Sequence, residues 1–332
     1  MTKKQLRSIF VLPLLLFSLS ALVGGCGSSK VEKDSDKISV VATIFPQYDF
    51  TRAIAGDNAE ITMLLKPGSE SHSYEPTPQD IITIQKCDVF LYVGGENDAW
   101  VEEILSSMDT SNMQVIALTD CVDTVEEEVV EGMQESHEDE AETVDDVSGQ
   151  KAEAQRGEID EHVWTSPKNA QKIVDKISRA LCTADPEHAS DYEANTSEYQ
   201  EELAKLDMQF RHVTDSAERR EIIFGDRFPL RYFAEEYGLT YYAAFPGCAS
   251  DTEPSAATIA FLIDKVKEDK IPIVFKIELS NGNMAEAIAD ATGAREETFY
   301  SCHNISADDW NNGETYLSLM EKNVETLKDA LN

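Results

Sequence analysis

Two hydrophobic patterns alternate along the chain after residue 37. Short runs rich in β-branched and aromatic residues predict buried strands, and longer segments with apolar residues on one helical face predict helices. The strands predicted in this way are 38–44, 60–65, 89–93, 115–118, 221–224, 239–245, 271–277 and 297–300. The helices predicted with them are 47–55, 79–86, 98–108, 229–237, 254–270, 284–292 and 314–331. Because parallel strands need helical crossovers, this pattern predicts an α/β fold with two similar lobes.

Two further helical segments, 168–182 and 186–217, separate the two sets of strands. The second segment carries apolar and aromatic residues along most of its length. At about 1.5 Å per residue, a continuous helix of this kind would be roughly 45 Å long. We therefore expect it to run along both lobes.

The composition changes abruptly at residues 122–160. This segment holds fifteen Asp or Glu residues against Lys151 and Arg156, and it has no aromatic residue. Such a segment buries too little apolar surface to fold, so it is predicted to be a disordered acidic insert. Its single histidine, His137, is a candidate for weak metal capture, with a solvated loop as the alternative.

The N-terminus has the pattern of an export signal. Basic residues precede an apolar run at 9–23, which ends in Gly24-Gly25-Cys26. We interpret residues 1–25 as a lipoprotein signal peptide, Cys26 as the acylated residue, and the polar stretch 26–37 as a tether. A lipid chain on Cys26 would hold the protein at a membrane surface, outside the cytoplasm, without spanning the membrane.

Charge narrows the class of partner. The formal net charge is −35. A basic footprint is absent, which excludes nucleic acid as a partner, and a field of this sign favours cations.

Two histidines in separate loops are candidate metal ligands. His72 follows the predicted strand 60–65 and precedes a helix start at Thr77-Pro78, and His162 lies just before a second proline-initiated helix. Neutral imidazole is a common ligand of zinc. His72 and His162 together predict a metal site assembled between elements.

The motifs PGSESHSYEPTPQDI, DEHVWTSPKNA, RYFAEEYGL and IADATGA resemble the metal-binding solute-binding lipoproteins of bacterial ABC importers, the zinc and manganese cluster. The resemblance covers nearly the whole chain after residue 37. It implies two lobes with four-stranded parallel sheets, one long connecting helix, a metal cleft between the lobes, a permease partner and a monomeric state. The divisions it suggests are a first lobe at 38–121, helices at 161–217 and a second lobe at 218–332.

The same resemblance guides the search for the remaining ligands. The family usually has a histidine at the end of the first strand of the second lobe, where this chain has Asp226, and a carboxylate after the last strand, where it has His303. We therefore hypothesise that the two ligand types are exchanged, so that His72, His162, His303 and Asp226 hold the metal. Glu278, which also ends a predicted strand, is an alternative carboxylate or a residue that orients an imidazole.

Cys248 and Cys302 each follow a predicted strand of the second lobe. Since disulfides persist outside the cytoplasm, a bridge between these two residues is predicted. The alternative is that Cys302 is a thiolate ligand beside His303, a choice that would select zinc.

The expected function is capture of a divalent metal, zinc in the first place, and its delivery to an ABC permease. No enzymatic reaction is implied. The alternatives are a manganese importer component, an adhesin whose metal is structural, and a zinc hydrolase. A hydrolase would keep one coordination position for water, and no HExxH spacing occurs in the chain.

Overall fold

The computed structural model describes residues 37–70, 74–95, 98–133, 158–249 and 254–332, and the statements below concern these residues. They belong to one compact unit, Lys37–Asn332. The predicted signal peptide, the acylated Cys26 and all of the tether except Lys37 lie outside the described residues. No helix within the described ranges is long and apolar enough to cross a membrane.

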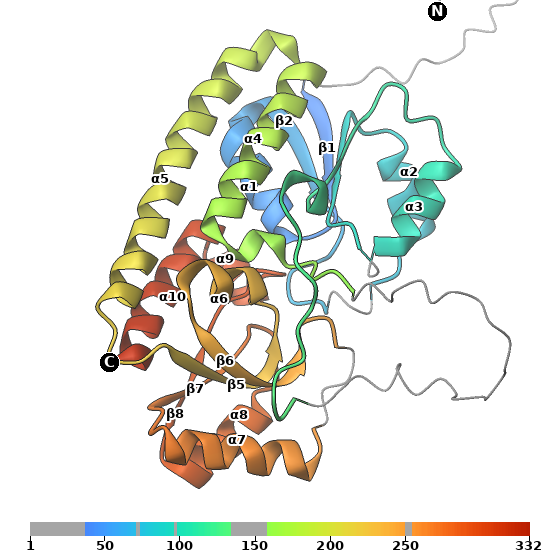
Figure 1. The fold of residues 1–332 in the computed structure, drawn as a ribbon. Helices are drawn as coiled ribbons and strands as arrows, with labels where there is room; N and C mark the ends of the chain where they lie inside the picture. The colour runs from blue at the N-terminus through green and yellow to red at the C-terminus, as the bar shows by residue number, and fades with distance from the viewer. Residues whose placement is uncertain (1–36, 71–73, 96–97, 134–157, 250–253) are drawn as a thin grey trace, which may run out of the picture. The chain divides into compact units, whose positions relative to one another are not determined.

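The first lobe is built on a parallel sheet with the strand order β2-β1-β3-β4 (Figure 1). Its strands are β1 (Ile38–Ala42), β2 (Ala59–Met63), β3 (Val89–Tyr92) and β4 (Gln114–Ala117). Its helices are α1 (Phe45–Ala55), α2 (Pro78–Ile84) and α3 (Ala99–Ser106). Neighbouring residues of β1 face opposite sides: Val40 joins the core that includes α1, and Val41 joins the core that includes α2 and α3. Burial on both faces explains why the central strands β1 and β3 are almost wholly apolar.

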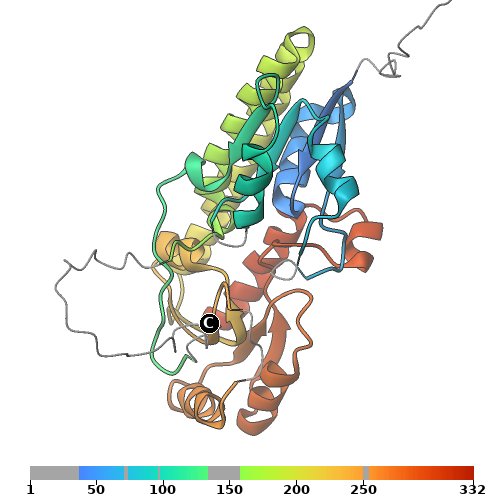
Figure 2. The same ribbon diagram turned by 90° about the vertical axis from the view of Figure 1, so that its right-hand side faces the viewer.

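The second lobe repeats this topology with the order β6-β5-β7-β8. Its strands are β5 (Glu221–Phe228), β6 (Thr240–Pro246), β7 (Ile273–Lys276) and β8 (Arg295–Thr298). Its helices are α6 (Arg231–Tyr237), α7 (Ala256–Glu268), α8 (Asn283–Thr292), α9 (Ala307–Asn311) and α10 (Tyr316–Leu331). Figures 1 and 2 show α7 and α8 together on one side of the sheet, where Ile223 and Val274 point into their core. The predicted pair of four-stranded parallel sheets is confirmed.

Several predicted boundaries differ from the structure by a few residues, and the last strand is one of them. The last strand was expected at 297–300, but β8 covers the polar residues 295–298. Phe299 follows the strand, is fully buried, and still donates its backbone N–H to the carbonyl of Lys276. An edge strand needs fewer apolar residues than a central one, which explains the shift. The short helix α9 has no counterpart among the predicted elements.

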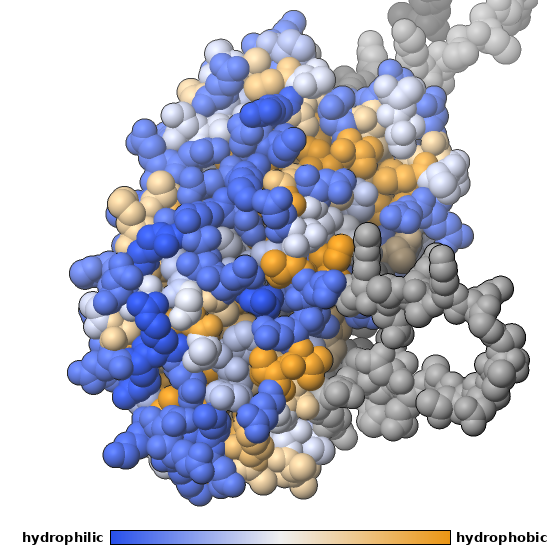
Figure 3. All heavy atoms as spheres, in the orientation of Figure 1, coloured by the Kyte–Doolittle hydropathy of each residue, from blue (hydrophilic) through white to orange (hydrophobic). Residues whose placement is uncertain are grey.

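Helix α5 (Ala189–Asp215), which follows α4 (Pro167–Ala184), contacts elements of both lobes. Its 27 residues give a length of about 40 Å. It packs against α1 and α4 at one end and against α6 and α10 at the other, and one hydrophobic core includes residues of both sheets. The predicted long connecting helix is therefore present, and the surface seen over it in Figure 3 is largely hydrophilic.

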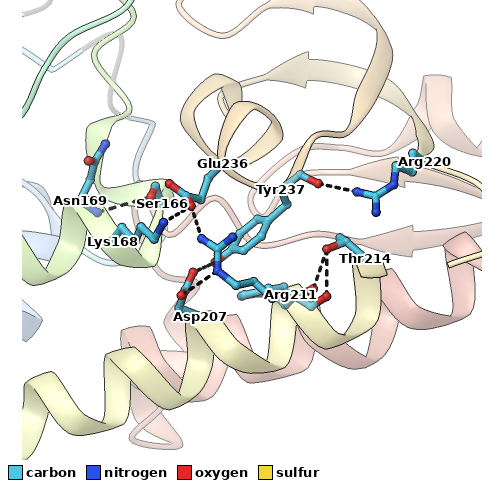
Figure 4. Close-up of polar contacts among 10 residues, drawn as sticks. Ser166, Lys168, Asn169, Asp207, Arg211, Thr214, Arg220, Glu236 and Tyr237 are labelled. Atoms are coloured by element: carbon cyan, nitrogen blue, oxygen red, sulfur yellow. Dashed lines mark hydrogen bonds and ion pairs between the residues drawn. The ribbon is translucent and has the colours of Figure 1, made fainter. Parts of the chain in front are cut away.

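A polar network joins α5 to α4 and α6 (Figure 4). Arg211 pairs with Asp207 at 3.0 Å and also contacts Glu236. Glu236 forms a second ion pair, with Lys168 at 2.6 Å. Tyr237 donates its hydroxyl to Asp207 at 3.0 Å. These partly exposed groups fix the orientation of α6, and the apolar core beneath them supplies most of the stability.

The prediction of disorder across residues 122–160 is wrong at both ends of the segment. Residues 122–133 run from the first lobe onto the second in both ribbon views (Figures 1 and 2), and residues 158–161 lie antiparallel to them. These two segments are here called the strap. The strap is held by an antiparallel bridge between Glu126 and Ile159. Apolar side chains spaced among its carboxylates, including Val125 and Met133, pack against the main core. Residues 134–157, with His137, lie outside the described residues.

We expect Phe210→Ala to lower the free energy of unfolding by about 3–5 kcal/mol, because Phe210 is fully buried between α5 and α6. Glu236→Gln, which removes one charge from the network above, should cost less than about 1 kcal/mol. Urea unfolding of both variants measures the difference. Equal losses would contradict this division between core and surface.

Candidate metal centre

His162 is held in one orientation by a neighbouring carboxylate. It precedes a short 3-10 turn (Val163–Thr165) and α4, and it is fully buried. Asp160 Oδ1 accepts the backbone N–H of His162 at 2.8 Å and lies 3.1 Å from its Nδ1. With Nδ1 facing a carboxylate, Nε2 is the nitrogen through which this ring would bind a metal. Burial alone would lower the pKa of His162, but the charge and hydrogen bond of Asp160 raise it above its ordinary value.

His303 approaches the same place from the second lobe. The centroids of the His162 and His303 rings are 5.2 Å apart, and Trp164 lies 5.5 Å from the first ring and 5.1 Å from the second. Trp164 Nε1 donates to the carbonyl of Ser301 at 2.9 Å, which fixes the indole against the loop that carries His303. The two imidazoles are thus close enough to share one ion with Zn–N bonds of about 2.0 Å.

Glu278 holds the loop that carries His303 through hydrogen bonds. Its buried carboxylate accepts the backbone N–H of Ser301 at 2.7 Å, the Ser301 hydroxyl at 2.7 Å and the backbone N–H of His303 at 3.1 Å. Burial raises the pKa of Glu278, and these hydrogen bonds oppose that shift. Glu278 therefore resembles a positioning group more than an exposed carboxylate that awaits a ligand.

A small cavity lies beside these groups. Its volume is about 20 Å³, roughly the space of one water molecule or ion, and His303, Glu278 and Arg227 are among its lining residues. A larger neighbouring cavity of about 530 Å³ is lined by Asp226 and Arg227 among others. Asp226 accepts the backbone N–H groups of Arg227 at 2.8 Å and Ile277 at 3.3 Å. The structure thus places His303 and Glu278 on one cavity and Asp226 on the next.

The loop that leads to His72 is attached to the second lobe. Arg227 reaches Glu70 with an N–O distance of 3.1 Å, and Asn304 Nδ2 donates to the carbonyls of Lys66 at 2.9 Å and Ser69 at 2.7 Å. His72 itself lies outside the described residues. Among the residues that the structure does describe, no three His, Cys, Asp or Glu side chains form a group that could hold a metal ion. The four-ligand set therefore stays a prediction.

The profile of the family described as "Zinc-uptake complex component A periplasmic" matches residues 40–330. The chain belongs to this family. The high-affinity zinc uptake system protein ZnuA of Bacillus subtilis is 32% identical over 323 residues, which are 95% of this chain and 97% of that protein. The zinc-binding lipoprotein AdcA of Streptococcus pneumoniae is 31% identical over 96% of this chain, which spans only 60% of AdcA.

Solved structures of relatives have the same fold. The Zn(II)-bound ZnuA-like domain of Streptococcus pneumoniae AdcA has a TM-score of 0.69 and 29% identity, covering 89% of this chain and 99% of that domain. The metal-dependent lipoprotein YcdH of Bacillus subtilis has a TM-score of 0.73 and 30% identity, covering 89% of this chain and 100% of that structure. The expected resemblance to zinc-binding solute-binding proteins is confirmed.

The cysteine prediction is wrong for this member of the zinc-uptake family. Cys248 and Cys302 are free thiols in the structure, so they form no bridge. Cys302 adopts a φ of 58° and its side chain is fully buried in the main core, whereas the next residue, His303, lines the small cavity. Burial raises the pKa of the Cys302 thiol well above its ordinary value, which also disfavours the alternative of a thiolate ligand.

Several residues of the site were not among the sequence candidates. Asp160 and Trp164 flank His162 in the motif DEHVW, and their short spacing from a histidine is a signal that could have identified them. Arg227 and Ser301 act through long-range contacts to Glu70 and Glu278, which no local pattern indicates.

Gly247 leaves room for the His162 ring. A Cβ added there would lie 3.1 Å from His162 Cε1 and 3.0 Å from the carbonyl oxygen of Phe228. We expect Gly247→Ala to displace the imidazole and to lower zinc affinity by about 10-fold, as measured by competition with a chromophoric chelator.

The control for this prediction is Gly313→Ala. Gly313 has a φ of 75° and open space around the added methyl group, so the variant should lose stability and keep its zinc affinity. Unchanged affinity in Gly247→Ala would show that the His162 ring tolerates the contact.

Proposed function

We propose that this protein binds Zn²⁺ outside the cytoplasm and delivers it to the permease of an ABC importer. The observation that carries the proposal is the convergence of His162 and His303, with ring centroids 5.2 Å apart, beside an ion-sized cavity. Membership of the zinc-uptake family supports the same metal. Zinc is the cargo in this proposal, and it is bound and released without any chemical change.

The proposed nitrogen ligands are His72, His162 and His303. Three imidazoles suit zinc better than manganese, which prefers oxygen ligands. Glu278 lines the same cavity as His303 and is better placed than Asp226 to approach the ion or to orient an imidazole. We therefore rank Glu278 above Asp226 as the carboxylate of the site.

Release of the metal would use loops at the rim of the site. The contacts of Arg227 with Glu70, and of Asn304 with the carbonyls of Lys66 and Ser69, join the loop before His72 to the second lobe. Because α5 and the shared core join the two lobes, we propose that small shifts of these loops free the ion.

A binding role accounts for the site without an enzymatic step. The His162 imidazole is oriented by the buried Asp160 carboxylate, as in stable metal sites, and the buried Glu278 carboxylate holds the backbone N–H of His303. A zinc hydrolase would instead keep a water molecule on the metal with a general base beside it. We propose a monomeric solute-binding protein that is not an enzyme.

Zinc titration tests this function. We expect the protein to bind Zn²⁺ more tightly than Mn²⁺ in competition with a chromophoric chelator. His72→Ala, His162→Ala and His303→Ala should each lower zinc affinity by more than the roughly 10- to 100-fold typical of an outer-shell residue. His212→Ala, on the exposed face of α5, is the control and should bind as the wild type does.

Two results would contradict the proposal. Equal zinc affinity in the control and in any one histidine variant would remove that histidine from the ligand set. Ester or peptide hydrolysis by the zinc-loaded wild type, lost in the same variants, would favour an enzyme.

We also propose acylation of Cys26, on the basis of the basic and apolar residues before it and the small residues at 24–25. Cys26→Ala should abolish incorporation of a labelled fatty acid, because this thiol is the proposed acylation site. Labelling of the wild type and of the variant measures this. A wild type that takes up no label, or a variant that is still labelled, would refute acylation of Cys26.

A further inference from the structure

The strap is paired by an unusual ladder. Asp160 donates its backbone N–H to the carbonyl of Val125 at 3.0 Å, and Glu127 donates to the carbonyl of Glu158 at 2.8 Å. In a regular antiparallel pair, opposite residues exchange two N–H to carbonyl bonds. Val125 and Asp160 make only one of these bonds directly. The second is completed by a side chain from the second lobe.

Tyr232, on α6, occupies the position of the second bond. Its hydroxyl accepts the backbone N–H of Val125 at 3.2 Å and donates to the carbonyl of Asp160 at 2.7 Å. One phenol oxygen thus satisfies both the N–H of Val125 and the carbonyl of Asp160, and this pair of residues is here called the rung. Tyr232 is 5% exposed and Asp160 is 1% exposed, so no bulk water replaces the hydroxyl when it is removed.

Asp160 links this rung to the candidate metal centre. The residue whose carbonyl is held by Tyr232 is the same one whose carboxylate holds the N–H and the Nδ1 of His162. We propose that Tyr232 is a positioning residue for His162, and that the strap sets the orientation of this imidazole for zinc. This inference rests on the proposed zinc-binding function for its affinity readout.

Other contacts keep the strap in place when this rung is altered. Glu127 accepts the backbone N–H of Cys248 at 2.9 Å. Glu128 pairs with Arg231 at 3.1 Å and accepts the hydroxyl of Tyr241 at 3.2 Å. Removal of the Tyr232 hydroxyl therefore acts on the rung at Asp160 and leaves the neighbouring anchors intact.

Tyr232→Phe is the test, and Tyr237→Phe is the matched control. Tyr237 is also a buried tyrosine of α6, but its hydroxyl donates to Asp207 of α5 and, among the described residues, makes no hydrogen bond to the strap. We expect Tyr232→Phe to lower zinc affinity by about 10-fold, at the lower end of the range for outer-shell residues, and Tyr237→Phe to leave it unchanged. Urea unfolding of both zinc-free variants separates a loss of stability from a loss of affinity.

A second readout needs no metal. In zinc-free protein labelled with ¹⁵N at histidine, the wild type should show His162 protonated at Nδ1, because that nitrogen faces Asp160. Tyr232→Phe should shift or broaden the His162 nitrogen resonances, and Tyr237→Phe should not. A structural role of Tyr232 without positioning of His162 would leave these resonances unchanged.

Val125→Pro removes the donor of the same rung and gives an independent variant. It should lower zinc affinity as Tyr232→Phe does, and the double variant should lose no more than either single one. Equal behaviour of Tyr232→Phe and Tyr237→Phe in both measurements, or additive losses in the double variant, would overturn the inference. A wild type that fails to bind zinc would refute the proposed function, and the nitrogen resonances would still decide the role of Tyr232.

Discussion

Buried carboxylates must be satisfied by hydrogen bonds, and this requirement shapes the region between the lobes. Asp160 meets it with the backbone and ring of His162, and Glu278 meets it with Ser301 and the backbone of His303. Each carboxylate therefore holds one loop that carries a histidine. The His162 and His303 rings, whose centroids are 5.2 Å apart, are carried by these two held loops.

The sheets supply the frame for these loops. Both have the same strand order, and the loops after their central strands open toward the region where the candidate residues lie. Glu278 follows β7, Asp226 lies at a register shift within β5, and His303 follows β8. The irregularity in β5 explains how Asp226 comes to face backbone N–H groups of Arg227 and Ile277 and the larger cavity, away from His303.

The sequence predicted the fold well because most of its strands are short apolar runs separated by amphipathic helices, and the polar edge strand β8 is where this pattern misplaced the bounds. His162 could be named from its place before a proline-initiated helix, and His303 from the family resemblance that pointed to the residues after the last strand. The predictions failed at positions whose structure is determined by contacts between residues far apart in the sequence. The acidic composition of residues 122–133 concealed a few apolar side chains that bind the core, and the spacing of Cys248 and Cys302 could not show that Cys302 turns inward at a φ of 58°.

The main hydrophobic core has a further consequence. It contains Val40 and Phe50 from the first lobe, Phe210 from α5, and Phe224 and Phe275 from the second lobe in one continuous cluster. Neither half can lose its packing without exposing side chains that the other half buries. We therefore infer that the described parts of the two lobes melt in a single cooperative transition, with no stage at which one lobe persists alone.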